Sequence, residues 1–584
     1  METSLVPQSY SNKPSLPDDI INELFDIAAD LDPAGQPESA SNRRKLGWIN
    51  LTHVCRRWRE VGLDRSTLWA NVVTTFPRAL DVMLARAKSV PLTLDIYDIA
   101  FMRGLLLSPT YLASILFLVS RARHIKDEDH WDSGCRPVNA VTNSRRHRKD
   151  PSTVNRRNWA HILRGQTLPT LEYLELIDGS WYNDRRPIVV ETPFTAPNLH
   201  TCKLGRFIPF RAPSLSSLWL NDTRLAWTHH LDILDACPML VDVTILGGLW
   251  SDIGEQNLDY FEHSESWMEE SELEDALAAL CDVPNSRPVV ALDCLQTMTL
   301  DHCGCEAHLL LQHLSIPAHA TVEVGAFDEI ILFRRFISQL QPRLCRPEMT
   351  VLQLSSRSSS EFFDRPFASV SFAGSIVNWE WPSVKSTDVT IKLNFSVSPD
   401  HHRKSGFMPS LLSSLPSATA AHIRTLSFGG EYFNDVEYDL SPEDVGRWIT
   451  LLTNFSGVTT LYLQSNVYSV LSSYLNEQTA TSETLLPNLH TVVLYGDPDG
   501  DPVFCTWWAD IESWLLMRKT TGSPVMRVVL TGILCHLVDQ DIILPGGRYR
   551  MEKLGFEGIM GLVDEVVDER IVADGKGCSC ASRC

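Results

Sequence analysis

The sequence lacks the short motifs that mark most enzyme classes. Its 584 residues contain no Gly-x-Ser-x-Gly nucleophile motif, no Gly-x4-Gly-Lys-Ser/Thr phosphate loop, no His-Glu-x-x-His metal motif and no dinucleotide-binding fingerprint. Carboxylates are numerous, but no spacing places a particular pair together for acid–base chemistry. An intrinsic active site is therefore unsupported, and we expect a protein that is not an enzyme.

Basic residues and cysteines are also scarce. The chain has 51 Lys and Arg against 72 Asp and Glu, a net charge of −21, and this argues against nucleic acid as the main partner because phosphate binding needs a positive face. Fourteen cysteines at irregular spacing are too sparse for a disulfide scaffold. Residues 1–14 are predicted to be disordered, and this polar start has no signal-peptide core. We expect a cytoplasmic or nuclear protein with reduced thiols.

A convincing membrane-spanning run is missing as well. Residues 104–120 form an uncharged stretch of 17 residues, which is the short limit for a span, and Pro109 splits it. The stretch therefore predicts a core helix from about residue 111 to residue 119, and no membrane partner is expected.

Three short segments with large apolar faces are present within residues 16–72. The first follows Pro17 and two acids, the second repeats apolar residues at intervals of three and four, and the third can be capped by Asp64 or Ser66. Three such helices make a domain of about sixty residues, near the lower limit for independent stability, so we expect another body to cover part of their apolar surface. The alternative is a helical domain that caps the next domain and binds nothing.

The order of these segments resembles the F-box family: Leu16-Pro17, a helix rich in Ile and Leu, then Val54-Cys55-Arg56-Arg57-Trp58, then Leu68-Trp69. The resemblance covers about a tenth of the chain, and residues 30–47 lengthen the first link beyond the usual pattern. It implies that this domain docks the small adaptor subunit of a cullin-RING ubiquitin ligase. The implied adaptor-binding residues are Leu16, Pro17, Ile20, Ile21, Leu24, Phe25, Leu51, Val54, Cys55, Trp58, Leu68 and Trp69.

From residue 168 onward a Leu-x-x-Leu-x-Leu pattern recurs, often preceded by proline. Its copies lie 16 to 55 residues apart, mostly near the spacing of leucine-rich repeats, which the sequence resembles in a degenerate form. In each copy the Leu-x-Leu pair points inward from a short strand, so stacked copies bury one continuous core. The copies begin at Leu171, Leu199, Leu215, Leu240, Leu295, Met349, Ile423, Val458 and Leu489, with weaker ones at Val322/Val324 and Ile391/Leu393.

The predicted fold class is therefore α/β: an N-terminal three-helix F-box-like bundle followed by an irregular leucine-rich-repeat solenoid, a curved parallel sheet with helices outside. A sandwich of two sheets is the alternative. The expected domains are residues 15–75 for the bundle, 76–165 for linking helices, a first strand and a basic loop, 166–545 for the repeats with an acidic insertion at 252–275, and 546–584 for a tail. The basic run and the acidic insertion are interpreted either as contact segments or as solvated loops.

One cluster resembles a metal site, namely His302, Cys303, Cys305 and His308. Structural zinc sites space their cysteines by two to four residues and need a second pair, which does not follow. The tail cysteines Cys578, Cys580 and Cys584 are interpreted as exposed thiols. We predict no metal and no cofactor.

These patterns favour a substrate-recognition subunit of an SCF-type ubiquitin ligase, acting in ubiquitin-dependent protein degradation through protein–protein contacts. Its partners would be the ligase adaptor and an unidentified target protein, with target contacts expected at Glu175, Trp219 and Tyr462, which lie between inward leucines. A leucine-rich-repeat scaffold without a ligase is the main alternative. A metal-dependent enzyme using His302 and Cys305 is a further one.

Overall fold

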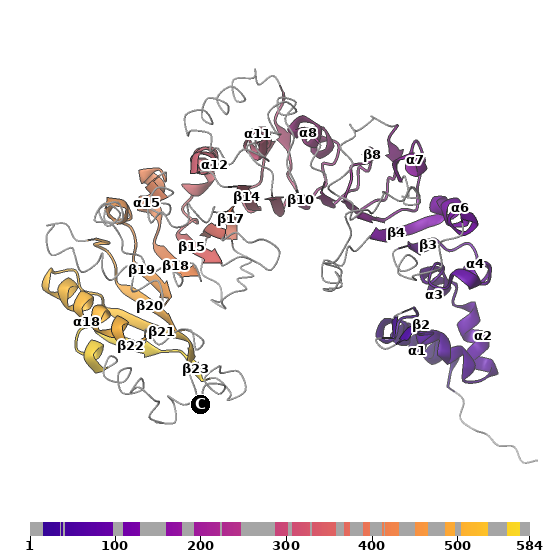
Figure 1. Cartoon of the computed structure of the whole chain (residues 1–584), viewed down its shortest axis with the longest axis horizontal. Helices are drawn as coiled ribbons and strands as arrows, with labels where there is room; N and C mark the ends of the chain where they lie inside the picture. Colours follow the sequence, from indigo (N-terminus) through magenta and orange to yellow (C-terminus); the bar gives the residue numbers. More distant parts are fainter. Residues whose placement is uncertain are drawn as a thin grey trace, which may run out of the picture. The chain divides into compact units, whose positions relative to one another are not determined.

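The protein is a mixed α/β structure with a large parallel sheet and helices, as the computed structural model in Figure 1 shows. Two compact units are present, residues 1–222 with 236–240 (the first unit) and residues 223–235 with 241–584 (the second unit). No helix among the described residues is both long and apolar enough to cross a membrane. The structure describes residues 16–35, 37–38, 41–96, 109–128, 159–177, 192–221, 225–246, 287–301, 306–327, 330–357, 367–373, 389–396, 412–413, 415–430, 450–464, 485–496, 504–534 and 557–572.

The first unit begins with short helices. In order they are α1 (Asp18–Leu31), η1 (Gly47–His53), α2 (Arg56–Asp64) and α3 (Ser66–Asn71), and an antiparallel pair, β1 (Pro37–Glu38) and β2 (Ser41–Arg44), lies within the long link after α1. The second apolar segment was expected to form a single helix from residue 51 to residue 61, and this prediction is wrong. Cys55 is extended and separates η1 from α2, while the Thr52 hydroxyl donates to the carbonyl of Ile49 and closes the earlier turn.

Aromatic rings fill the space between these helices. The ring centroids of Trp48 and Trp69 are 4.8 Å apart, and those of Phe25 and Trp48 are 6.1 Å apart. Gly62 allows the close crossing, because a Cβ atom there would lie 2.6 Å from Cζ of Phe25. The Gly62 carbonyl also accepts a hydrogen bond of 2.8 Å from Nε1 of Trp69. The large apolar side chains of this sequence thus build a compact helical core.

The remainder of the first unit contains a parallel sheet with the strand order β3-β4-β5-β7-β9. The linking helices expected in this part of the chain are present, and among them is the core helix predicted near residues 111–119, here α6 (Pro109–Leu118). The strands of this sheet are β3 (Leu92–Asp95), β4 (Ala122–Glu128), β5 (Tyr173–Ile177), β7 (Thr201–Leu204) and β9 (Ser217–Leu220). A small parallel pair is formed by β6 (Phe194–Thr195) and β8 (Phe210–Arg211). Its further helices are η2 (Pro77–Ala79), α4 (Leu80–Ala87), α6 (Pro109–Leu118), η3 (Val119–Arg121) and α7 (Trp159–Leu163).

The second unit pairs its strands in the order β10-β12-β14-β17-β16-β15-β18-β19-β20-β21-β22. Helices α8 (Trp227–Asp235), α11 (Glu306–Gln312), α12 (Ile330–Leu344), α15 (Ser417–His422) and α18 (Phe504–Thr520) lie along one side of these strands (Figure 1). The strands are β10 (Asp242–Leu246), β12 (Thr297–Asp301), β14 (Thr321–Phe327), β15 (Val351–Arg357), β16 (Phe367–Ala373), β17 (Val389–Ser396), β18 (Thr425–Gly430), β19 (Thr460–Gln464), β20 (Thr491–Gly496), β21 (Arg527–Leu534) and β22 (Glu565–Asp568), with β11 (Val290–Ala291) pairing β13 (Leu314–Ser315).

Two features of this sheet depart from a simple succession of repeats. Strand β16 is antiparallel to both neighbours, and β17 rather than β15 pairs with β14, so three strands form an inserted meander. The segment predicted as a tail also contributes β22 and β23 (Ile571–Val572), both parallel to β21. These strands escaped prediction because they lack the full leucine pattern that marks the others.

A recurring turn leads into the strands and explains the spacing of the leucine pattern. The first apolar residue of each copy donates its backbone N–H to the carbonyl three residues earlier, as in Leu171 to Leu168 (3.3 Å) and Leu489 to Leu486 (3.0 Å). Proline often follows the accepting residue because its φ suits the second position of such a turn. The same contact occurs at Leu199, Leu215, Leu240, Leu295, Met349, Ile423 and Val458. The inward Leu-x-Leu positions are buried in all nine copies.

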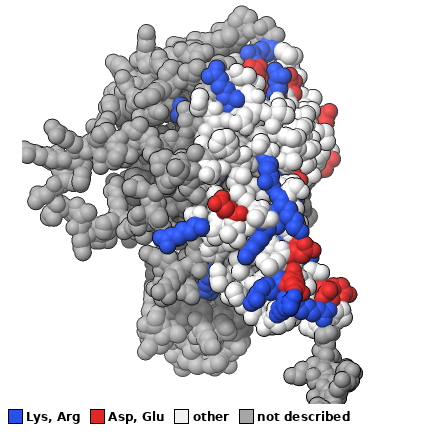
Figure 2. Space-filling view, turned by 90° about the vertical axis from the view of Figure 1, so that its right-hand side faces the viewer, with Lys and Arg blue, Asp and Glu red and all other residues white. Residues whose placement is uncertain are grey.

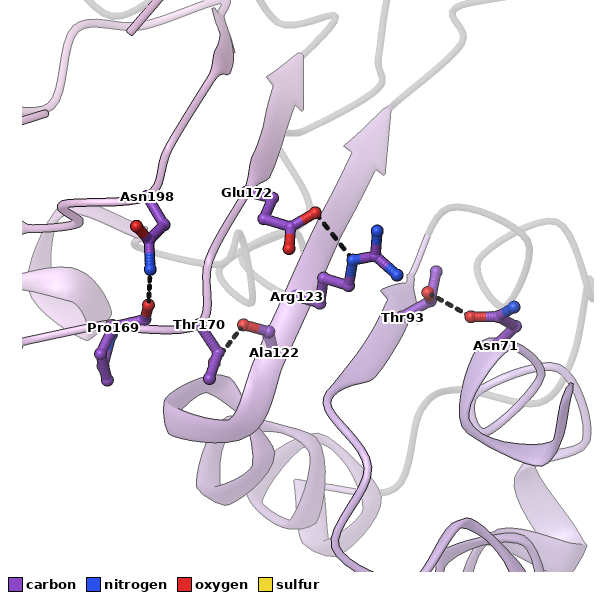
Figure 3. Close-up of polar contacts among 8 residues, drawn as sticks. All are labelled: Asn71, Thr93, Ala122, Arg123, Pro169, Thr170, Glu172 and Asn198. Carbon is purple, nitrogen blue, oxygen red and sulfur yellow. Dashed lines mark hydrogen bonds and ion pairs between the residues drawn. The ribbon is translucent and has the colours of Figure 1, made fainter. Parts of the chain in front are cut away.

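Polar side chains join the segments around the starts of successive strands. Figure 3 shows Asn198 donating to the carbonyl of Pro169 (2.7 Å) and Arg123 paired with Glu172 (2.8 Å). In the second unit Asn488 makes the contact that corresponds to Asn198, with its Nδ2 2.8 Å from the carbonyl of Ser456. Both asparagines directly precede the first leucine of a copy, so one short sequence produces the same contact in both units.

Two arginines, the buried Arg518 and the half-buried Arg343, bind the turns from the helix side. Arg518 lies in the last turn of α18 and donates to the carbonyls of Leu485 (2.7 Å) and Leu486 (3.0 Å) just before β20. Arg343 of α12 binds Pro317 (3.0 Å) and Ala320 (2.7 Å) before β14 in the same way. Burial lowers the pKa of each guanidinium to about 10, which leaves both charged at neutral pH.

Candidate functional site

Helix α1 carries apolar side chains on two different faces. Ile21 and Phe25 are buried at 1% and 0% exposure, whereas Ile20 (39%), Ile27 (46%) and Leu31 (80%) are open. With Leu16 (47%) and the half-buried Leu24, the open residues follow one another at intervals of three or four. At about 100° per residue the four positions within the helix, 20, 24, 27 and 31, fall within an arc of about 60°. Leu16 lies two residues before the helix begins at Asp18. We call Leu16, Ile20, Leu24, Ile27 and Leu31 the α1 stripe.

Helix α2 runs beside α1 on the side opposite the α1 stripe. Nη2 of Arg57 lies 2.8 Å from Oδ1 of Asp18, and Arg65 pairs with Asp26, so both contacts join residues 39 positions apart. The equal separation means that the two helices run in the same direction. Asp18 and Asp26 project from α1 at roughly 160° and 240° from Ile20, taking about 100° per residue. The α1 stripe therefore faces away from α2.

The other predicted adaptor-binding residues divide between core and surface. Val54 is 60% exposed, Pro17 and Cys55 are exposed, and Leu51 and Trp58 are half-buried. Four other predicted contact residues are buried core side chains in this structure: Ile21, Phe25, Leu68 and Trp69. They face the aromatic core, where they support the exposed residues from beneath. Ile27 and Leu31 were missed, although their spacing continues that of Ile20 and Leu24.

Charged side chains of both signs surround the helices. Figure 2 shows acidic and basic groups interspersed on the described surface at its lower right. Arg56 pairs with Glu60 at 2.8 Å and Lys88 with Asp64 at 2.6 Å, and the hydrogen bond from Lys88 lowers the pKa of the Asp64 carboxyl. Such exposed pairs contribute little stability. They keep this end of the protein soluble while leaving the α1 stripe uncharged.

A cavity of about 420 Å³ lies between α1, α3 and β3. Its lining includes Asp26, Asp30 and Asp95 beside apolar groups such as Leu68 and Val72. Asp26 is already paired with Arg65, and the backbone N–H of Asp95 donates to the Thr74 hydroxyl at 3.1 Å. Among the described residues no group of three or more His, Cys, Asp or Glu side chains could hold a metal ion.

The sheet face opposite the leucines is the second candidate surface. In the first unit its register partners form the row Asp95, Lys126, Glu175, Lys203 and Trp219. Oε1 of Glu175 is 3.5 Å from Nζ of Lys203, Oε2 is 4.0 Å from Nζ of Lys126, and Oε2 also accepts from the Tyr173 hydroxyl. Glu175 is 5% exposed, so this predicted contact residue is an internal counter-ion rather than an open side chain.

Over strands β18 to β21 of the second unit, the corresponding face is far less polar. Ser427, Tyr462, Val493 and Val529 are successive register partners there. Ser427 is 0% exposed, Val493 5% and Val529 7%, and burial raises the pKa of the half-buried Tyr462. Tyr462 and Trp219 thus lie on different units, and the structure does not bring these two predicted contact residues together.

The predicted metal-like cluster lies largely outside the described residues, which exclude His302, Cys303 and Cys305 as well as the tail cysteines. His308 is described and is buried in α11. Its Nε2 is 2.8 Å from Nε2 of Gln312, its ring meets Phe336 edge-on, and burial lowers its pKa to about 4. His308 is therefore accounted for as a neutral imidazole that packs between α11 and α12.

No family model matches the chain, and a search of curated proteins finds no significant match.

Proposed function

We propose that this protein is a substrate-recognition subunit of an SCF-type cullin-RING ubiquitin ligase. Its F-box-like helices dock the ligase adaptor, and its leucine-rich-repeat-like sheet presents a target protein. The receptor makes no covalent bond itself. Holding the target beside a ubiquitin-charged partner raises the effective concentration of the reacting groups.

The observation that carries the proposal is the α1 stripe. Helix α1 packs on the core through its buried side chains, whereas Ile20, Ile27 and Leu31 are exposed to water and add little to the stability of the fold. Full burial of an exposed aliphatic side chain contributes about 1.5–3 kcal/mol, so a partner that covers these residues would gain binding free energy. From Ile20 to Leu31 the helical part of the stripe is about 16 Å long at about 1.5 Å per residue, a length suited to the groove or helix of another protein.

The experiment is co-purification of the adaptor with the full chain. The test variant carries Ile20→Glu and Ile27→Glu, both on the α1 stripe and away from the aromatic core. A matched control carries Val82→Glu and Val289→Glu, because these valines are also exposed, at 49% and 61%, but lie on other elements. We expect the stripe variant to lose the adaptor, the control to retain it, and both to melt at the temperature of the unmodified chain.

Retention of the adaptor by the stripe variant would refute α1 docking. If the unmodified full chain fails to retain the adaptor, the ligase role falls and a repeat scaffold without a ligase remains. A circular dichroism spectrum of each variant separates loss of binding from loss of fold.

A further inference from the structure

The charged row on the sheet of the first unit has two unlike ends. Its signs alternate from Asp95 through Lys126 and Glu175 to Lys203, and the last position is Trp219. Neighbouring strands are about 4.8 Å apart, so each charge lies next to its opposite. Lys126 has a carboxylate on the strand at either side. Lys203 has Glu175 on one side and an aromatic ring on the other.

Glu175 holds Lys203 in place. The carboxylate side chain is 7% exposed and lies 3.5 Å from the ammonium nitrogen, while the Lys203 side chain is 38% exposed. The same ammonium stands 5.8 Å from the ring centroid of Tyr173. An ammonium group has three donors, and Glu175 engages it from within the sheet. The outward part of the Lys203 head group therefore faces solvent in a restricted position next to Trp219.

We propose that Lys203 and Trp219 recognise an acidic residue with an apolar neighbour in a segment of the target protein. The target carboxylate continues the alternation of charge beyond Lys203, and the adjacent apolar side chain packs on the indole. Glu175 is a positioning residue, because it is too deeply buried to touch the target. This inference rests on the proposed role as a target receptor and names the chemistry of the target segment.

The test uses the full chain and fluorescence anisotropy with three labelled probes. Each is a short Gly/Ser peptide whose centre is Glu-Leu-Glu, Glu-Ser-Glu or Lys-Leu-Lys. We expect Glu-Leu-Glu to bind tightest, with an advantage of about fivefold over each of the others, as a partly exposed ion pair and a small apolar contact each allow. Added salt should weaken the binding of Glu-Leu-Glu and Glu-Ser-Glu.

Two variants assign the effects to the two residues. Lys203→Glu should remove the preference for acidic probes, and Trp219→Ala should remove the difference between Glu-Leu-Glu and Glu-Ser-Glu while keeping the preference for acid over base. Lys45→Glu makes the same charge change at an exposed lysine on a different element and should alter nothing. If the three probes bind equally, or if Lys203→Glu keeps the acid preference, the inference is wrong.

Adaptor co-purification from the same preparations keeps this inference distinct from the proposed ligase role. Loss of probe discrimination with the adaptor retained refutes the target chemistry alone. Discrimination without adaptor retention refutes the ligase role and leaves a scaffold that binds acidic segments.

Discussion

The two units use the same strand pattern but fill its middle position differently. In the first unit the position between the inward leucines holds Glu175, Lys203 or Trp219, and in strands β18 to β21 of the second it holds Ser427, Tyr462, Val493 or Val529. The inward pairs are buried in both. The inward positions are therefore required by the fold, whereas the middle position is open to other uses. A charged middle position marks a surface suited to a polar partner, and a buried one marks a face that serves stability.

The largest expected effect concerns the inward leucines, which are buried in both units. Leu204→Ala in the first unit and Leu463→Ala in the second should each lower the free energy of unfolding of the unit concerned by about 2–5 kcal/mol, because each removes a buried side chain and leaves a cavity. Hydrogen exchange resolved by strand measures each unit separately. A loss confined to one unit would show that the leucine pattern is not equivalent in the two.

The second largest loss of stability is expected at Arg518, the buried arginine at the end of α18. Arg518→Met removes two hydrogen bonds to turn carbonyls and is expected to cost about 3 kcal/mol, since hydrogen bonds to charged groups contribute about 1.5–3 kcal/mol. Urea unfolding followed by hydrogen exchange of β20 and β21 is the measurement. Lys519→Met, on the exposed neighbour, serves as the control, and an equal loss in both variants would contradict the role given to Arg518.

Acid should destabilise the second unit through His230. The ring is 1% exposed, neither nitrogen has a hydrogen-bond partner among the described residues, and burial lowers its pKa to about 3. The unfolded chain takes up a proton near pH 6.5 that the folded chain refuses until about pH 3, so the free energy of unfolding falls as the pH drops between these values. We expect a loss of about 2 kcal/mol from pH 7 to pH 5.

Urea unfolding at the two pH values measures this loss, and His230→Leu should remove the part that His230 contributes. His229→Leu at the neighbouring exposed position is the control and should leave the pH dependence in place. An unchanged pH dependence in His230→Leu would show that the imidazole is solvated in the folded protein.

The middle position itself can be exchanged. Val493→Lys places an ammonium group on the buried face of the second unit and should cost about 1–3 kcal/mol, the usual penalty for a polar group without a partner. Thr201→Lys, on the corresponding half-buried face of the first unit, should stay within about 0.5 kcal/mol. Strand-resolved hydrogen exchange compares them, and equal costs would remove the distinction between the two faces.

The smallest effect concerns the contact that the two units have in common. Asn198→Ala and Asn488→Ala each remove one hydrogen bond to the preceding turn and should cost about 1 kcal/mol in their own unit. Urea unfolding with a probe in each unit measures both. Unequal losses would show that the two turns, despite their shared sequence, are not equally well formed.

Much of the strand arrangement could be predicted because its signal is local. All nine full copies of the leucine pattern carry the expected buried pair. The turn before each of them was not predicted, although the proline that often precedes a copy belongs to it. The α1 helix and the α6 core helix were also predicted, since amphipathic spacing or an uncharged run is visible within one turn or two. The broken helix at Cys55 was not predicted, because the Thr52 hydrogen bond that ends η1 competes with an apolar spacing that would suit a longer helix.

The candidate surfaces were predicted less well than the strands. Glu175 and Trp219 share a face by alternation alone, but the burial of Glu175 between two lysines depends on β4 and β7, which are distant in sequence. The same limit applies to Phe25 and Ile20, which look alike as apolar residues of one helix and differ only in what packs against them.

Local chemistry alone settled where the chain forms the strands that carry the leucine pattern and the turns before them, because hydrogen bonding three residues back and the alternation of side chains involve near neighbours. Tertiary packing decided which apolar side chains of α1 remain open, where β16 and β17 enter the sheet, and which charges on it share a buried partner. Those outcomes depend on which segments, far apart along the chain, come to lie side by side, and the strand pattern leaves that choice open.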